Sequence, residues 1–145
     1  MGFDFNHFVE LIPDINTAFL QTIQMISISL FVSVAIGLPV GILLYVTDKG
    51  LFFEHRTIQT FLGFFVNLVR SIPFLILLVA LLPLTDLLVG TTIGPVAASV
   101  SLSVAAIPFF ARIVESALRE IDKGVIEAAI AAGATPWMII KDVLL

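Results

Sequence analysis

Few residues of this 145-residue chain are of types that do chemistry, and the most informative group lies near its C-terminal end. Glu127, Ala128 and Ala129 are followed, after three residues, by Gly133. A lone carboxylate can pair with an arginine or lysine of another protein, and small side chains let a second backbone come close. This combination predicts a docking surface for a soluble partner.

Several other kinds of chemistry are excluded by residue type. The chain has no cysteine, and its two histidines, His7 and His55, lie far apart in the sequence, so no metal-ligand cluster is expected. There is no glycine-rich phosphate loop and no basic stripe, which argues against nucleotide and nucleic-acid binding. We therefore expect no cofactor and no nucleic-acid partner.

The rest of the chain is built for a lipid bilayer. It is 59% hydrophobic and only 12% charged, and three long runs carry almost no charge. About 20 apolar residues cross a bilayer as a helix, and the runs lack the alternation of membrane barrels. The sequence predicts an all-α polytopic membrane protein with helices at about 17–47, 57–83 and 92–111, and a helix-turn-helix loop at about 120–145.

The basic residues predict an orientation. Outside the apolar runs, Lys and Arg are absent from the N-terminal tail and from the second connector. They occur in the first connector and in the C-terminal stretch, as Lys49, Arg56, Arg112, Arg119, Lys123 and Lys141. Basic residues concentrate on the cytoplasmic side. The N-terminus is therefore expected outside and the C-terminal loop in the cytosol.

The first apolar run contains Gly37, Pro39 and Gly41. Proline lacks an amide proton, so a bend near Pro39 is expected. Two glycines four residues apart allow another helix to approach closely, although glycine is also common in membrane helices without such a role.

The third run contains Ser99, Ser101 and Ser103, which suit either helix contacts or a polar path. We expect this helix to continue beyond Ala111 into the cytosol. There, Glu115 has the spacing to pair with an arginine three residues before it and another four residues after it, on a solvated face.

The second run carries the one charge within these apolar segments. Arg70 is followed by Ser71-Ile72-Pro73, where the helix is expected to kink or break. A buried arginine usually faces a bundle interior or a wet cavity. The alternative is that Arg70 extends its head group toward the cytosolic side. Arg70, Ser71 and Pro73 are thus candidates for a translocation path.

The C-terminal stretch has the capping residues of two short helices. Asp122 is a candidate N-cap, Gly133 fits the left-handed position after a helix, and Thr135-Pro136 suits the start of the next one. The first of these helices is rich in alanine and has few basic and few large apolar residues, which disfavours a helix lying on the bilayer.

These residues resemble the cytoplasmic coupling loop of ABC importer permeases. In that family Glu-Ala-Ala is followed by three residues, Gly, nine residues, Ile, one residue and Leu-Pro. Glu127, Ala128, Ala129 and Gly133 match; Val143 replaces the Ile and Leu145 occupies the Leu position. Arg70-Ser71-Ile72-Pro73-Phe74 and Gly133-Ala134-Thr135-Pro136 look like the permeases of methionine importers.

The resemblance implies a partial type I ABC permease fold spanning residues 1–145 and a location in the cell membrane. It also implies a permease homodimer, a separate ABC ATPase subunit docked on the coupling loop, and an extracytoplasmic substrate-binding (lipo)protein that delivers methionine. Such permeases have about five spans, so the chain is expected to be an N-terminal portion. The alternatives are a permease for another amino acid or small solute, or a membrane protein that does not transport.

Overall fold

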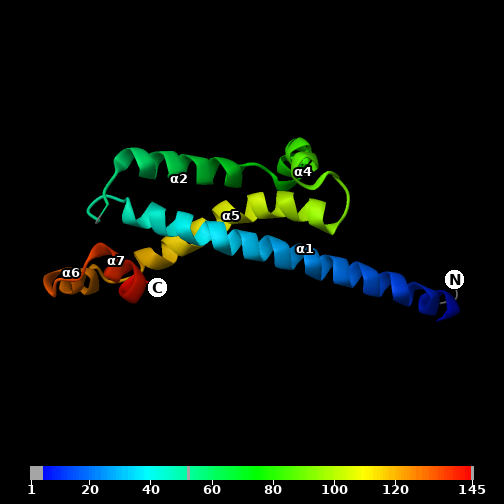
Figure 1. Cartoon of the computed structure of the whole chain (residues 1–145), viewed down its shortest axis with the longest axis horizontal. Coiled ribbons are helices and arrows are strands. Elements are labelled where there is room, and N and C mark those ends of the chain that lie inside the picture. Colours follow the sequence, from blue (N-terminus) through cyan, green and yellow to red (C-terminus); the bar gives the residue numbers. More distant parts are fainter. Residues whose placement is uncertain (1–4, 52, 145) are drawn as a thin grey trace.

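The described part of the chain is mainly helical and contains no strand, as predicted. The computed structural model describes residues 5–51 and 53–144, and the side chains of residues 11–51, 53–122 and 124–142. The helices are α1 (Phe5–Val46), α2 (Arg56–Ser71), α3 (Phe74–Ala80), α4 (Leu82–Val89), α5 (Pro95–Arg119), α6 (Lys123–Ala131), α7 (Pro136–Ile139) and a π-helical turn (Ile140–Leu144). Figure 1 shows α2 and α5 beside the C-terminal half of α1, while its N-terminal half projects alone.

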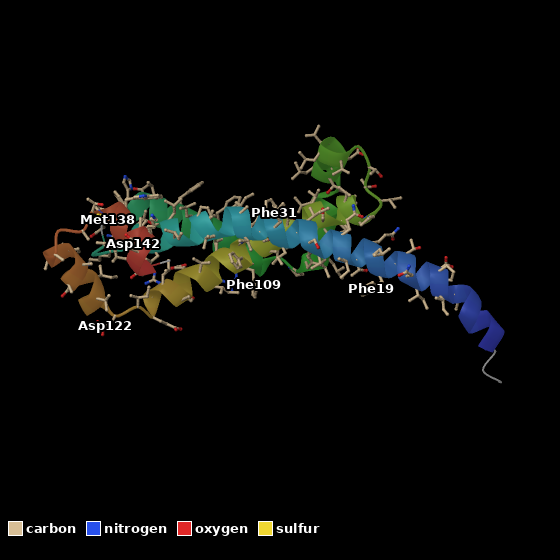
Figure 2. All side chains as sticks on the ribbon, turned by 60° about the horizontal axis from the view of Figure 1, so that its bottom comes forward. Phe19, Phe31, Phe109, Asp122, Met138 and Asp142 are labelled. Atoms are coloured by element: carbon tan, nitrogen blue, oxygen red, sulfur yellow. The ribbon has the colours of Figure 1, made fainter. Side chains whose placement is uncertain are left out.

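Helix α1 begins well before Thr17, where the charge-free run suggested a start. The Thr17 hydroxyl donates to the Pro13 carbonyl at 2.9 Å, which is the bond of a residue inside a helix rather than of a cap. Pro39 also lies within the helix, which continues to Val46. Its large apolar side chains point outward: Phe19 and Phe31, visible in Figure 2, are 62% and 75% exposed.

The main packing contact joins α1 to α5, and glycine makes it possible. A Cβ placed on Gly41 would lie 2.6 Å from the Ala111 carbonyl oxygen and 2.7 Å from Val114 Cβ. At Gly37 it would lie 3.0 Å from the Ile107 carbonyl oxygen. The predicted close approach at these two glycines is therefore confirmed, since the backbone of α1 lies directly against backbone and side-chain atoms of α5.

The second apolar run is broken where Ser71-Ile72-Pro73 predicted a break. Helices α2 and α3 meet at 104°, and Ile72 between them is extended. The residue before a proline disfavours the helical region, which explains the extended backbone. The predicted helix end at Pro83 is wrong. Pro83 lies in the first turn of α4, where a missing N–H costs nothing. Gly90, at φ +75°, ends α4 instead.

Helix α5 continues beyond Ala111 to Arg119, as predicted. Ser99, Ser101 and Ser103 are buried in it. The Ser103 hydroxyl donates to the Ser99 carbonyl at 2.6 Å, and Ser29 of α1 donates to the same oxygen at 3.3 Å. Ser99 therefore lies at the α1–α5 contact, as the helix-contact alternative requires.

By length and composition, α1 and α5 can each cross a membrane. The bent pair of α2 and α3 qualifies as a third span if the two helices are counted together. Large apolar side chains are exposed along all of these helices, which is unfavourable in water and favourable in lipid.

Candidate functional site

Helix α6 begins at a side-chain cap. Asp122 is extended, and its carboxylate accepts the backbone N–H of Gly124 at 2.7 Å. An acceptor at this position satisfies one of the free amide protons of the first turn. The predicted N-cap is confirmed, and it fixes where α6 departs from the end of α5.

Helix α6 ends in a left-handed glycine turn. Gly133 has φ +85°, its N–H donates to the Ile130 carbonyl at 2.9 Å, and the Ala134 N–H donates to the Ala129 carbonyl at 3.0 Å. These are the two bonds of a Schellman motif. A Cβ on Gly133 would meet nothing within 4 Å, so its backbone conformation, not lack of space, requires glycine.

The second short helix is capped by Thr135, whose hydroxyl accepts the N–H of Met138 at 3.4 Å, with Pro136 in the first turn. Ile139 at its end is 1% exposed. It belongs to a buried cluster with Tyr45 and Val46 of α1, Leu118 of α5 and Ile126 of α6. The helix-turn-helix is therefore packed against the ends of both long helices.

The motif residues take different positions on this unit. Glu127 and Ala128 are exposed, as is Gly133, whereas Ala129 is half-buried against the cluster. Ala129 is therefore not part of the exposed surface of small side chains that the sequence predicts for a partner. Val143 lies in the π-helical turn, with its side chain outside the described part. Leu145 also lies outside the described residues.

The exposed face of the same unit carries large apolar groups. Trp137 is 71% exposed, Met138 51% and Ile130 50%. Figure 2 shows Met138 and Asp142 at the end of the molecule opposite the projecting half of α1. Exposed apolar patches of this kind mark surfaces that contact another protein or the membrane.

A charged network lies where α5 leaves the helix bundle. Glu115 is 1% exposed, and both of its carboxylate oxygens accept hydrogen bonds. One accepts from Arg112, and the other accepts from Nε and Nη2 of Arg119 at 3.1 and 2.9 Å. The predicted pairings are present, but the expected solvated face is wrong for Glu115. Leu118 and Ala111 are buried on the same helix, and this side packs inward.

The two arginines extend the network to the other helices. Arg112 donates to the Asn67 side-chain oxygen of α2 at 2.7 Å. Arg119 lies 2.6 Å from the Asp48 carboxylate, which follows α1. The roles of Asp48 and Asn67 were missed in the sequence, because contacts between distant segments leave no local spacing signal.

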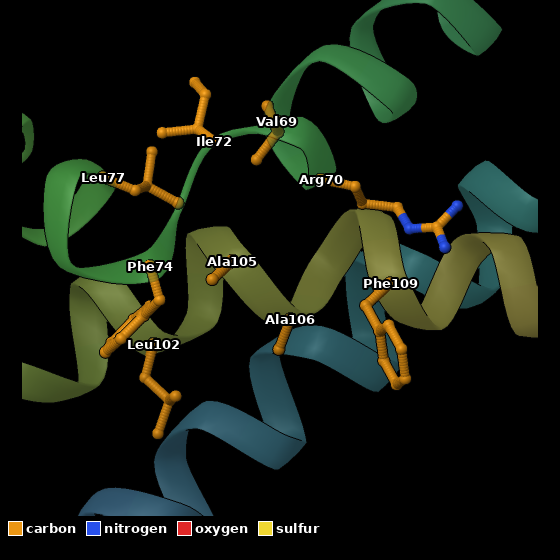
Figure 3. Close-up of a pocket in the computed structure, with 9 residues that line it drawn as sticks. All are labelled: Val69, Arg70, Ile72, Phe74, Leu77, Leu102, Ala105, Ala106 and Phe109. Atoms are coloured by element: carbon orange, nitrogen blue, oxygen red, sulfur yellow. The ribbon is translucent and has the colours of Figure 1, made fainter.

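Arg70 lines a cavity of about 370 Å³ at the elbow between α2 and α3 (Figure 3). Its other lining residues are apolar: Val69, Ile72, Phe74, Leu77, Leu102, Ala105, Ala106 and Phe109. Ser71 and Pro73 do not line it. The Ser71 hydroxyl donates to the Asn67 carbonyl at 2.8 Å, and Pro73 precedes α3. Of the three path candidates, only Arg70 lies in the cavity.

The Arg70 side chain extends out of this cavity. In Figure 3 its guanidinium points along α5, past Phe109. Arg70 also lines a second groove, shared with Phe109 and Arg112. Arg112 lies on the side of α5 that continues to the helix-turn-helix, so the direction favours the alternative in which Arg70 extends toward that end.

The structure therefore combines long apolar helices with an exposed helix-turn-helix that is anchored on their ends. The model of the family described as binding-protein-dependent transport system inner membrane component matches residues 37–145. The chain belongs to this family, and the resemblance to ABC importer permeases is confirmed. It is thus a multi-pass membrane protein.

Two curated relatives are similar to most of this chain. The chain is 49% identical over 129 residues to the probable D-methionine transport system permease protein MetI of Vibrio cholerae. It is 50% identical over 125 residues to the D-methionine transport system permease protein MetI of Escherichia coli strain K12. These alignments cover 89% and 86% of this chain, and it spans 57% and 58% of the length of those relatives.

The fold matches solved transporters. A chain of the MetNI methionine ABC transporter, in an inward-facing conformation, superposes with a TM-score of 0.91 at 46% identity. This match covers 94% of the present chain and 63% of that one, and confirms the type I ABC permease fold. An amino acid ABC transporter solved with histidines has a TM-score of 0.63 at 22% identity, which supports the fold alone.

Proposed function

We propose that this chain is the permease portion of an ATP-driven importer of methionine, and that α6 is its coupling helix. The observation that carries the proposal is the helix-turn-helix, which is packed on the ends of α1 and α5 through Ile126 and Ile139 while Glu127 and Ala128 remain exposed. A rigid unit of this kind can be pushed by an ATPase subunit and pass the motion to the membrane helices. The relatives support methionine as the substrate.

The proposed assembly contains more than this chain. A second permease copy, two ATPase subunits and an extracytoplasmic binding protein complete it. ATP binding and hydrolysis take place in the ATPase subunits, so the permease itself is not an enzyme. The permease changes between inward-facing and outward-facing states as the coupling helices move, and substrate passes between the two permease copies.

The proposed orientation has the N-terminus outside and the helix-turn-helix in the cytosol. It is supported by the distribution of basic residues. Because the chain has no cysteine, single cysteines can be introduced at Thr92 and Lys49, both exposed and in different connectors, and treated with a membrane-impermeant maleimide in intact cells. Labelling at Thr92→Cys only is expected. Labelling at Lys49→Cys only would invert the topology.

The docking role of α6 is tested by charge reversal. Glu127→Lys places a cation where an arginine or lysine of the ATPase is expected to bind, so ATPase co-purification and methionine uptake should fall at least tenfold, as for about 1.4 kcal/mol of lost binding. The matched control is Glu120→Lys, at an exposed position just beyond α5. Unchanged co-purification with Glu127→Lys, or an equal loss in the control, would contradict the assignment.

The substrate is tested by uptake. The chain is produced with a methionine-importer ATPase and binding protein in cells that lack their own methionine import, and uptake of labelled L- and D-methionine is measured. Competition by unlabelled histidine and other amino acids tests the specificity. ATP-dependent uptake blocked by methionine alone is the expected result, whereas block by another amino acid would change the substrate.

A further inference from the structure

We infer that Glu115 is a positioning residue. It holds the end of α5, at the base of the helix-turn-helix of α6 and α7 (the coupling unit), to α2 and to the segment after α1, so that motion of α6 reaches both of them. This inference rests on the proposed function and adds a residue outside the docking surface. Glu115 lies eight residues before Lys123, where α6 begins, on the last turns of α5. Its carboxylate pairs with Arg112 and Arg119, which lie outside the predicted docking surface, and it acts through these two arginines.

The centre of the network is buried, while its arms reach the surface: the Arg119 side chain is 46% exposed and that of Asp48 24%. Glu115 is 1% exposed, and its two oxygens are divided between Arg112 and Arg119. A buried carboxylate with both oxygens satisfied by guanidinium groups has few alternative geometries. A surface ion pair, by contrast, exchanges its partners freely and adds little.

Each arginine joins Glu115 to a different element. Arg112 donates to Asn67 of α2, and Arg119 pairs with Asp48 in the segment after α1. The four charged members are two carboxylates and two guanidinium groups, so their formal charges cancel. A neutral network of this kind can be partly buried without leaving an isolated charge.

The network lies directly against the coupling unit. Leu118, one turn after Glu115, belongs to the buried cluster that holds Ile126 and Ile139. A displacement of α6 therefore acts on the end of α5 through Leu118. With the network intact, the segment after α1 and the helix α2 must follow. Without it, α5 can shift alone, and ATP hydrolysis proceeds with little transport.

The first test measures the arrangement and does not depend on the substrate. Spin labels at Lys49→Cys and Glu120→Cys report the distance between the segment after α1 and the end of α5. We expect a narrow distance distribution, broadened by Glu115→Gln and by the milder Asp48→Asn. The matched control Asp86→Asn, at an exposed position of α4, should leave it narrow. An unchanged distribution in both network variants overturns the inference.

The second test measures coupling in the assembled transporter, as methionine imported per ATP hydrolysed in proteoliposomes. Glu115→Gln and Asp48→Asn are expected to lower this ratio about tenfold, within the usual range of coupling free energies, with ATPase binding unchanged. Loss of ATPase binding together with transport would assign Glu115 to docking and overturn the inference. A wild-type ratio in both variants would also overturn it. Absence of methionine import by the unmodified protein would instead contradict the proposed function, and the spin-label distances would still decide the role of Glu115.

Discussion

The close contact between α1 and α5 leaves Gly41 with less room for a side chain than any other glycine in the described part of the chain. In Gly41→Ala the new Cβ would lie 2.6 Å from the Ala111 carbonyl oxygen, whereas ordinary contacts begin at 3.4 Å. The two backbones must therefore separate by roughly 0.8 Å, because backbone atoms cannot rotate away as a flexible side chain does. The same change at Gly37 starts from 3.0 Å and requires about half of that separation.

The expected cost follows from two opposing effects. Overpacking of a close contact destabilises by about 1–3 kcal/mol, and α1 meets backbone here, so the upper part of the range applies. Replacing glycine by alanine inside a helix returns about 1 kcal/mol. Gly41→Ala should therefore lower the stability by roughly 1–2 kcal/mol, and Gly37→Ala by less.

The assay is thermal unfolding followed by circular dichroism in a mild detergent. Gly63→Ala is the matched control, since a Cβ there would meet only Leu44 Cδ2, at 4.0 Å. It should unfold at the wild-type temperature or slightly above. The order of melting temperatures, Gly41→Ala lowest and Gly63→Ala highest, is the expected result. Equal melting of all three variants would refute the reasoning that α1 and α5 are in backbone contact.

Two further predictions concern the coupling unit. Gly133→Ala places a side chain at φ +85° and should weaken the turn by about 1–2 kcal/mol without any clash, visible as faster proteolysis after α6 and weaker ATPase co-purification; wild-type proteolysis would mean that the turn can be formed otherwise. Ile139→Ala leaves a cavity at a buried position and should lower the stability of the coupling unit by about 2–5 kcal/mol, detected as faster protease cleavage within residues 122–144. The same change at exposed Met138 should not alter the cleavage rate.

Local features were predicted well because their causes are local. The caps at Asp122 and Thr135, the glycine turn at Gly133 and the break before Pro73 each depend on the backbone preferences of one or two residues. The residue preferences of helix ends were therefore sufficient to predict where the two short helices of the coupling unit begin and end.

Features that depend on packing were not predictable in the same way. The spacing of Glu115 from its two arginines was correct, but burial of the carboxylate depends on which side of α5 faces α1 and the coupling unit. The inward position of Ala129 has the same origin, since it packs against a cluster formed by residues from four helices. The apolar run predicts a helix end at Pro83, whereas Pro83 lies in the first turn of α4, a new helix that begins at Leu82.

The exposed Trp137 has a practical consequence. It is the only tryptophan of the chain and lies, 71% exposed, on the helix-turn-helix. Indole emission shifts to shorter wavelength when the ring leaves water, so in this chain the signal arises from one position on the proposed docking face. Contact with a partner that itself lacks tryptophan can thus be followed in unlabelled protein, and the coupling unit carries its own optical reporter.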